Sequence, residues 1–201
     1  FGQDLIDIYT EVPELISHVH LPVQSGSNNI LKAMRRRHTR DEYIETINKL
    51  KEIRPGISIS SDFIVGFPGE SEEDFQDTLD LTDEVEYDES FSFIYSPRPN
   101  TTAKDLEDSV SPQEKKERLD RLQAKLEQSA LSISRRMVGR VSNSLVTGVS
   151  KKDPGEFQAR TENNKVVIFS CDDQSLIGNF VPVEIVEAKT KSLRGIYRPE
   201  C

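Results

Sequence analysis

The stretch SSDFIVGFPGESEEDF, from Ser60 to Phe75, decides how the first part of the chain folds. A β-rich run from Ile57 to Val65 ends at the glycine loop Gly66 to Gly69, and Ser71 with Asp74 is typical of a helix-starting capping box. Glycine adopts backbone angles closed to other residues and lets a ligand approach the bare main chain. In an α/β fold such a loop lies at the carboxyl ends of the strands, where ligands bind. Many strand-to-helix turns carry glycine for geometry alone, so both interpretations stay open here.

Length and composition limit the class of protein. The 201 residues are enough for one or two domains with a sizeable core. No apolar run approaches the ~20 residues of a membrane span, so we expect a soluble protein without membrane contact, and the low cysteine content fits a reducing cytoplasm. The two cysteines, Cys171 and Cys201, are too few for a disulfide framework or a metal cage, and no metal site is expected. The first residue is Phe1 and no targeting segment is visible, so we expect a piece of a longer protein.

The net charge of −9 is distributed unevenly along the chain. Residues 1–137 carry 17 basic and 27 acidic side chains, whereas residues 138–201 carry 9 basic and 8 acidic ones. A near-neutral module on an acidic body can bind a polyanion through a local basic face, although the overall field does not steer the polyanion there. The charge therefore permits RNA binding without predicting it.

Strands and helices alternate in the first part of the sequence. Short apolar runs are typical of buried strands, and apolar residues at helical spacing are typical of amphipathic helices. The alternation predicts parallel strand pairing with right-handed crossovers, in too few units to close a barrel. The predicted elements are strands at His18–Val23, Ile57–Val65 and Ser90–Tyr95, and helices at Asn28–Met34, Asp41–Ile53 (capped by Thr39) and Glu72–Val85.

A long helix and a small β domain are predicted next. Ser111, Pro112 and Glu114 together are typical of a helix start with a reciprocal capping glutamate, and the helix is predicted to end at Met137. Beyond it the pattern has period two, which predicts a small antiparallel barrel of the type that includes oligonucleotide-binding folds. We place the domain boundary near Val138, between residues 1–137 and 138–201. The five predicted strands are Val141–Val149, Glu156–Thr161, Lys165–Phe169, Phe180–Glu187 and Leu193–Tyr197.

Several linked motifs resemble, in order and spacing, the carboxyl-terminal half of the tRNA methylthiotransferases, which are radical S-adenosylmethionine enzymes. The resemblance covers nearly the whole chain. It implies an α/β fold that forms part of a (β/α) TIM-like barrel, followed by a small all-β TRAM barrel that binds RNA. The motifs are HLPVQSGS (20–27), MRRRHT (34–39), SDFIVGFPGE (61–70), YSPRPNTTA (95–103) and RTENN (160–164).

The resemblance also implies a reaction, cofactors and partners. The most similar type adds a methylthio group to C2 of N6-isopentenyladenosine beside the tRNA anticodon, using S-adenosylmethionine and two 4Fe-4S clusters. Such clusters need thiolate ligands, so their cysteines are expected upstream of Phe1 and this chain alone is expected to be inactive. The implied partners are the anticodon stem-loop of tRNA and an electron donor, and the protein is expected to be a monomer.

Cofactor-binding roles follow from the resemblance, position by position. Gln24 and Ser25 match polar groups presented to the ribose of S-adenosylmethionine, although a loop side chain can instead bond its own backbone. Arg36 matches an arginine that holds the methionine carboxylate through a bidentate fork. Its neighbours Arg35 and Arg37 have no such counterpart, and we expect them to be solvated.

The strand before the glycine loop resembles the adenine-contacting strand of radical enzymes. On it, Asp62, Val65 and Gly66 are the candidate residues, although Asp62 can instead bond a neighbouring strand. Phe93 shares a strand face with Tyr95 and is a candidate for stacking on the cofactor. Aromatic residues on strands are more often part of a core, so that alternative stays open.

RNA-binding residues are predicted in both parts of the chain. Arg98 favours a tRNA substrate over a ribosomal protein, and Arg160 belongs to a segment that the resemblance implicates in tRNA binding. The asparagines of that segment are equally typical of a hairpin turn. The remaining candidates are Thr161, Asn163, Asn164, Lys191 and Arg194.

Two other classes of function remain open. One is a related methylthiotransferase that acts on N6-threonylcarbamoyladenosine or on a ribosomal-protein aspartate. The other is an RNA-binding module without catalysis. Gln24, Arg36 and Asp62 favour an enzyme, because a pure RNA binder has no use for a cofactor-binding half-barrel.

Overall fold

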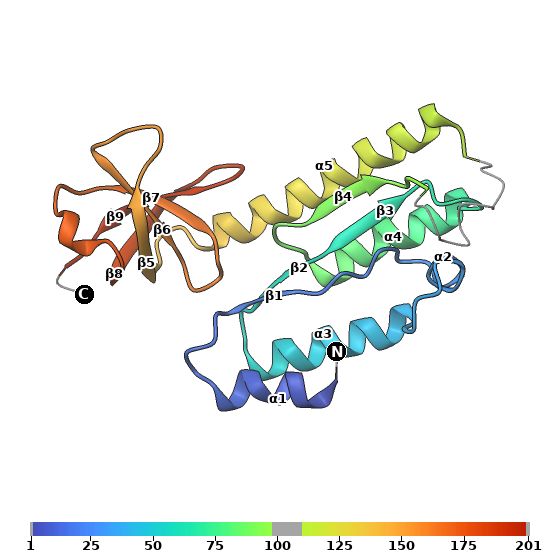
Figure 1. Ribbon diagram of the computed structural model, residues 1–201, viewed down its shortest axis with the longest axis horizontal. Coiled ribbons are helices and arrows are strands. Elements are labelled where there is room, and N and C mark those ends of the chain that lie inside the picture. The colour runs from blue at the N-terminus through green and yellow to red at the C-terminus, as the bar shows by residue number, and fades with distance from the viewer. Residues whose placement is uncertain (1, 98–109, 200–201) are drawn as a thin grey trace. The chain divides into compact units, whose positions relative to one another are not determined.

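The computed structural model describes residues 2–97 and 110–199, which separate into two compact units (Figure 1). The first unit falls within Phe1–Pro13 and Val19–Ser129, and the second within Glu14–His18 and Ala130–Cys201. The long helix α5 (Pro112–Arg136) contributes residues to both. The domain boundary near Val138 stays a prediction.

The first unit is an α/β structure in which the predicted order of strands and helices is present. Helix α1 precedes them and was not predicted from the sequence. The elements are α1 (Gln3–Glu11), β1 (His18–His20), α2 (Asn28–Ala33), α3 (Arg40–Ile53), β2 (Ser58–Ser60), β3 (Asp62–Val65), α4 (Glu72–Val85), β4 (Phe91–Ile94) and the first part of α5.

The single strand predicted at Ile57–Val65 is wrong, because the structure divides it into β2 and β3 at Ser61. The Ser61 hydroxyl accepts a hydrogen bond from the Val23 N–H and donates one to the Leu21 carbonyl, both at 2.9 Å. Strand β2 pairs with β1 and β3 pairs with β4, so the described strands of this unit form two two-stranded sheets. The β3–β4 pair is parallel, as predicted.

The helix starts of the first unit follow the predicted local signals. Thr39 and Ser71 both form complete capping boxes, with Glu42 and Asp74 as the reciprocal partners. Helices α1, α3, α4 and α5 contribute buried apolar residues to one core that also contains strand residues. Figure 1 shows how these helices are arranged around the strands. Its fully buried members include Tyr87, Phe63, Phe75, Ile47, Leu50, Ile59, Leu81 and Leu122.

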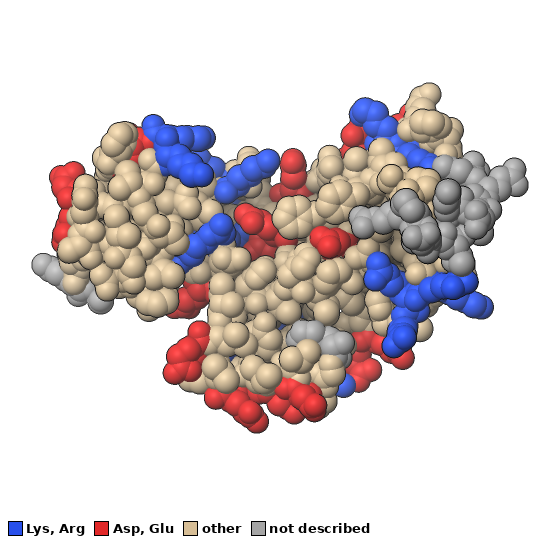
Figure 2. Space-filling view, in the orientation of Figure 1, with Lys and Arg blue, Asp and Glu red and all other residues tan. Residues whose placement is uncertain are grey.

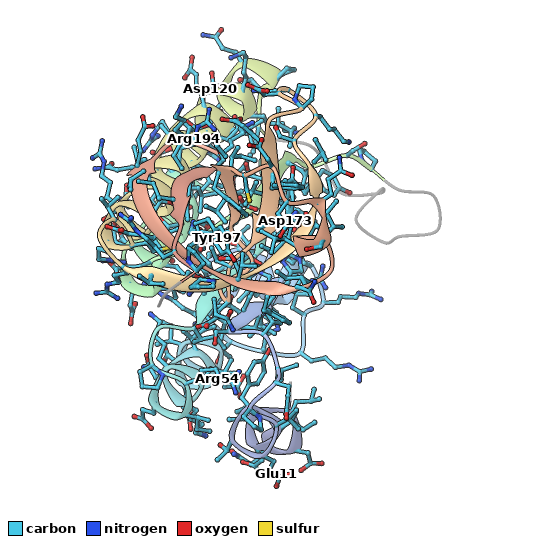
Figure 3. The ribbon with its side chains drawn as sticks, turned by 90° about the vertical axis from the view of Figure 1, so that its left-hand side faces the viewer. Glu11, Arg54, Asp120, Asp173, Arg194 and Tyr197 are labelled. Carbon is cyan, nitrogen blue, oxygen red and sulfur yellow. The ribbon has the colours of Figure 1, made fainter. Side chains whose placement is uncertain are left out.

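The second unit is a closed barrel of five strands in the order β5-β6-β7-β9-β8. Its strands are β5 (Val141–Val149), β6 (Glu156–Arg160), β7 (Val166–Ser170), β8 (Phe180–Ala188) and β9 (Leu193–Tyr197), and a short helix, η2 (Gln174–Leu176), precedes β8. The prediction of a wholly antiparallel barrel is wrong in one respect, because β7 and β9 run parallel. Figure 3 shows the barrel with Arg194 and Tyr197 of β9 labelled.

None of the helices in the described ranges is long and apolar enough to cross a membrane.

Candidate functional site

The glycine loop at the end of β3 has a backbone that requires glycine. Gly66 and Gly69 have φ angles of 68° and 85°, in the left-handed region that other residues rarely adopt. The Gly66 N–H donates to Glu70 Oε2 at 2.8 Å, and the Glu70 N–H donates to the Phe67 carbonyl at 2.9 Å. The loop is therefore closed by its own last residue, Glu70.

A buried arginine from helix α5 holds Glu70. The Arg118 guanidinium donates to Glu70 Oε2 at 2.8 Å and to the Glu70 carbonyl oxygen at 2.9 Å. The two side chains are only 2% and 1% exposed, respectively. Burial raises the pKa of the Glu70 carboxyl, and the hydrogen bonds from Gly66 and Arg118 offset only part of this rise.

Lys115, one turn before Arg118, covers Gly66 directly. A Cβ atom built on Gly66 would lie 2.4 Å from Lys115 Cγ, so no side chain fits between them. The Lys115 ammonium lies 6.0 Å from the centre of the Tyr95 ring, and that ring makes an edge contact with Phe67 at 4.9 Å. The first two turns of α5 thus pack on the glycine loop.

The segment Gln24–Ser27 runs beside β3. The Gln24 N–H donates to the Asp62 carbonyl and the Gln24 carbonyl accepts from the Ile64 N–H, both at 2.9 Å. Gln24 itself has a left-handed φ of 77°. The structure therefore brings the predicted residues Gln24 and Asp62 together on neighbouring stretches of backbone.

Ser25 is fully buried against helix α4. Its hydroxyl lies 3.3 Å from Thr78 Oγ1, which also accepts the Gly26 N–H at 2.9 Å. A Cβ on Gly26 would lie 2.4 Å from the Asp77 carbonyl oxygen, so this close approach requires glycine. These contacts favour the alternative in which Ser25 bonds within the protein.

Asp74 ties the same segment to the start of α4. Its carboxylate accepts from Ser27 Oγ at 2.5 Å, from Asn29 Nδ2 at 3.3 Å, and from the N–H and hydroxyl of Ser71 at 3.0 and 2.8 Å. Burial alone would raise the pKa of Asp74, but these hydrogen bonds together outweigh it and lower the pKa. The Asp74 carboxylate thus links the residues around Ser27 to the N-terminus of α4 by hydrogen bonds.

Asp62 and Phe93 lie on one face of the β3–β4 sheet. Asp62 pairs with Phe91, and Ile64 pairs with Phe93, so all four side chains project from the same side. Phe91 and Phe93 are 59% and 54% exposed, which contradicts a core role for Phe93. Asp62 Oδ2 also lies 3.5 Å from Nε2 of His20 on β1.

Val65 lies on the opposite, fully buried face of β3. Its carbonyl oxygen accepts the Tyr95 N–H at 2.9 Å, and the N–H of the next residue, Gly66, is bound by Glu70. Two of the backbone groups predicted to read a base edge are therefore already engaged within the protein.

Arg36 follows α2 and is exposed. Its N–H donates to the Leu31 carbonyl at 2.9 Å, and its guanidinium forms no ion pair with any residue in the described ranges. No contact there brings it to the glycine loop, so its role as a carboxylate ligand stays a prediction. Arg98 lies outside the described residues.

The RTENN segment forms the hairpin turn between β6 and β7. The Arg160 guanidinium donates to the Asn164 carbonyl at 2.7 Å, and the Asn164 N–H donates to the Thr161 carbonyl at 2.8 Å. Asn164 has a left-handed φ of 66°, and Thr161 Oγ1 accepts the Lys165 N–H at 3.0 Å. The turn interpretation is thus supported for Asn164, and Asn163 lies beside it in the same turn.

The last two RNA candidates lie at the β8–β9 end of the barrel. Lys191 is exposed in the turn before β9, and Arg194 on β9 forms an ion pair with Glu156. Basic side chains gather along one side of the barrel unit in Figure 2, whereas acidic ones line the edge of the first unit over α1 and α3. Figure 2 also shows a group of basic side chains on the first unit, near α2.

Sequence analysis did not identify Glu70 and Arg118. Glu114 was predicted to cap its own helix, but its carboxylate accepts from Arg118 at 2.5 Å, while Ser111 Oγ accepts the Glu114 N–H at 3.2 Å. A glutamate and an arginine four residues apart are typical of an exposed helical ion pair. The spacing of Glu114 and Arg118 in the sequence is therefore typical of an exposed Arg118 and does not indicate its buried contact with Glu70.

The residues present do not fit an iron–sulfur cluster. Cys171 lies partly buried in the second unit, Cys201 lies outside the described residues, and no group of three or more metal-binding side chains occurs in the described part of the chain. The exposed Phe93 ring and the Asp62 carboxylate share one sheet face, whereas the neighbouring Gln24 is buried.

Each part of the chain matches a known protein family. The Radical SAM superfamily matches residues 2–82 and the TRAM domain matches residues 135–197. Proteins from Hahella chejuensis and Pseudomonas syringae, each named tRNA-2-methylthio-N(6)-dimethylallyladenosine synthase, are 57% identical to this chain over 195 residues. A protein of the same name from Chromohalobacter salexigens is 55% identical over 196 residues. The matches cover 97% of this chain and 44% of each relative, so the chain spans less than half of their length.

Proposed function

We propose that the chain, which matches the Radical SAM superfamily over residues 2–82 and the TRAM domain over residues 135–197, is part of an enzyme that methylthiolates C2 of N6-isopentenyladenosine in tRNA. The isopentenyl group is the dimethylallyl group in the names of the relatives. Those relatives match the chain from the first unit through the second. The proposal concerns a whole enzyme of which this chain supplies two parts.

The first unit is proposed to bind the adenosine part of S-adenosylmethionine. The observation that carries this proposal is the joint placement of Gln24, Asp62 and Phe93 around β3 and β4. An exposed aromatic ring offers a stacking surface, and the part-exposed Asp62 carboxylate beside it offers hydrogen-bond acceptors to a nucleoside. Gly66 and Val65 shape the adjoining loop, while Ser25 anchors the Gln24 segment to α4.

The methionine part of the cofactor and the iron–sulfur clusters are proposed to be bound away from the β3–β4 face. Arg36 is proposed to bind the methionine carboxylate, since its exposed guanidinium is available for a bidentate pair. When bound, S-adenosylmethionine supplies the radical, and two 4Fe-4S clusters are proposed to be held by cysteines beyond this chain. The residues of this chain bind and orient the cofactor, and the chain by itself is proposed to be inactive.

The barrel unit is proposed to bind the anticodon stem-loop of tRNA. Its exposed basic side chains offer phosphate contacts, which fix the position of an RNA without reading its sequence. The proposed contacts in this unit are Arg160, Thr161, Asn163, Asn164, Lys191 and Arg194, and Arg98, from the first part of the chain, is proposed to contact the tRNA as well. The enzyme is proposed to work as a cytoplasmic monomer with a separate electron donor.

The test uses the full-length polypeptide, reconstituted anaerobically with iron and sulfide. It is incubated with S-adenosylmethionine, a reductant and tRNA that lacks the methylthio group, and the digested nucleosides are analysed by mass spectrometry. We expect isopentenyladenosine to gain a methylthio group, and Arg36→Ala to abolish the gain. Arg37→Ala is the matched control, because Arg37 is exposed on the same segment and has no assigned role.

A different product would identify a different substrate. A methylthio group on threonylcarbamoyladenosine alone would replace the proposed nucleoside with that one. Cofactor cleavage by intact clusters without any modified nucleoside would overturn the tRNA proposal and favour the ribosomal-protein aspartate. A full-length protein that binds tRNA but never cleaves the cofactor would favour RNA binding without catalysis.

A further inference from the structure

Burying the ion pair between Arg118 and Glu70 costs desolvation free energy. Moving two charges out of water costs several kcal/mol per ion, and replacing such a pair with apolar residues is often neutral or stabilising. Both side chains are almost fully buried, in an α5 helix and a loop that are 48 residues apart in sequence. Net stability is therefore a weak explanation for the pair.

The geometry of the pair determines the shape of the glycine loop. Glu70 Oε2 accepts from both Gly66 and Arg118, and Arg118 also donates to the Glu70 carbonyl oxygen. The other carboxylate oxygen, Oε1, is buried without a hydrogen-bond partner in the described ranges. A single oxygen atom thus carries both bonds, and it joins the first glycine of the loop to the helix.

We propose that Arg118 is a positioning residue that acts through Glu70 to hold the glycine loop in the conformation that receives the adenosine part of S-adenosylmethionine. This rests on the proposed function of the first unit. Arg118 itself does not contact the cofactor. It fixes the carboxylate that binds the Gly66 N–H, and Gly66 directly follows the strand that carries Asp62.

Lys115 makes a second contact between helix α5 and the glycine loop. Its aliphatic stem packs where a Gly66 side chain would lie, and its ammonium lies over the Tyr95 ring. Helix α5 therefore contacts the loop by a polar link at Glu70 and by a packing contact at Gly66. Losing the polar link leaves the packing contact in place, so the loop should loosen rather than unfold.

The experiment compares variants of the 201-residue chain with two readouts. The first is amide hydrogen exchange of the segment 64–70. The second is the dissociation constant for 5′-methylthioadenosine, which carries the adenosine but neither the methionine carboxylate nor the amine. Binding is measured at a temperature where circular dichroism shows every variant to be folded, so that a general loss of structure does not alter it.

For Arg118→Met we expect faster exchange in segment 64–70 and an increase of about tenfold in the dissociation constant, equivalent to about 1.4 kcal/mol. The double variant Arg118→Met with Glu70→Gln should recover most of both effects, because the neutral amide still accepts the Gly66 N–H without a buried charge. The exchange rate and dissociation constant of Arg118→Lys should lie between those of Arg118→Met and those of the double variant, since an ammonium lacks the planar fork of the guanidinium.

The matched control is Arg121→Met. Arg121 lies on the same helix and is 47% exposed, and it pairs with Glu72 at 2.7 Å without touching the loop. Wild-type exchange and affinity in a folded Arg118→Met variant would overturn the proposal. If Arg118→Met does not fold, unchanged exchange and affinity in Arg118→Lys would overturn it.

If the first unit does not bind adenosine at all, the two readouts differ from those expected if Arg118 merely has no positioning role. Wild-type chain that does not bind 5′-methylthioadenosine would contradict the adenosine site and the ligand half of this proposal. Faster exchange of segment 64–70 in Arg118→Met would still support the loop half in that case.

Discussion

Two turns of this molecule each contain a residue in the left-handed conformation and each depend on an arginine, but the arginines come from different places. Gly66 is held through Glu70 by Arg118, which is buried and lies 48 residues from Glu70 in sequence. Asn164 is held by Arg160, which is part-buried and only four residues away. The first turn needs the tertiary structure, whereas the second is largely self-contained. We therefore expect the glycine loop to be much more sensitive to distant substitutions.

The largest expected difference is in stability. Arg118→Met leaves the Glu70 carboxylate buried without its partner and should lower the unfolding free energy of the first unit by about 3–5 kcal/mol. Arg160→Met removes one hydrogen bond in a part-exposed turn and should cost the second unit about 1 kcal/mol. Urea unfolding, followed by NMR signals from each unit, measures both. Equal losses of unfolding free energy in the two units would show that the Gly66 turn does not depend on its arginine more strongly than the Asn164 turn does.

A smaller effect is expected from side chains added to the glycines. Gly66→Ala and Gly69→Ala both place alanine at a positive φ, which should cost about 1–2 kcal/mol in each case. Only at Gly66 does the new Cβ meet Lys115, because the space around Gly69 is open. Gly66→Ala should therefore cost more than Gly69→Ala in the same urea experiment. Identical costs would mean that Lys115 moves aside freely.

The pH dependence of stability should differ in sign between two carboxyls of the first unit. The pKa of Asp74 is lowered, so its contribution is present above its ordinary pKa and is lost as the pH falls through the lowered value. The pKa of Glu70 is raised, so its contribution is present at low pH and is lost as the pH rises from its ordinary pKa through the raised value.

Unfolding free energies measured between about pH 3 and pH 7, which span the ordinary carboxyl range, check these signs. The advantage of wild type over Asp74→Asn should shrink as the pH falls. Wild type should gain stability relative to Glu70→Gln over the same fall. The same trend for both variants would contradict the assigned hydrogen bonds or the assigned burial.

The smallest effect is expected on RNA affinity at the barrel. Lys191→Ala should weaken tRNA binding at every sequence alike and reduce the slope of log affinity against log salt by about 0.7–0.9. Filter binding at several salt concentrations measures the slope. Lys49→Ala is the control and should leave the slope unchanged, because Lys49 is a part-exposed lysine on α3 that pairs with Glu45. An unchanged slope for Lys191→Ala would remove Lys191 from the interface.

Local signals in the sequence predicted much of the fold. The capping boxes at Thr39 and Ser71 and the β strands of the second unit are all decided within a few residues of chain. The turn at Asn164 belongs to the same class, because its hydrogen bonds come from its own hairpin.

Features that depend on distant partners were not predicted. The break at Ser61 depends on hydrogen bonds to Leu21 and Val23, some 40 residues away. The role of Arg118 depends on Glu70, which is 48 residues away in sequence, and its spacing from Glu114 is by itself only typical of an exposed pair. Within the candidate site, the sequence analysis named Asp62, Gly66 and Phe93, whose roles stay predictions, but it did not name Glu70 and Arg118, which hold the loop.

The coupling free energy between Arg118 and Glu70 tests the long-range dependence of the glycine loop most directly. It is obtained from the urea unfolding of wild type, Arg118→Met, Glu70→Gln and the double variant. We predict a coupling of about 2 kcal/mol or more, with the double variant more stable than Arg118→Met alone. Additive effects, with a coupling below about 0.5 kcal/mol, would contradict the account.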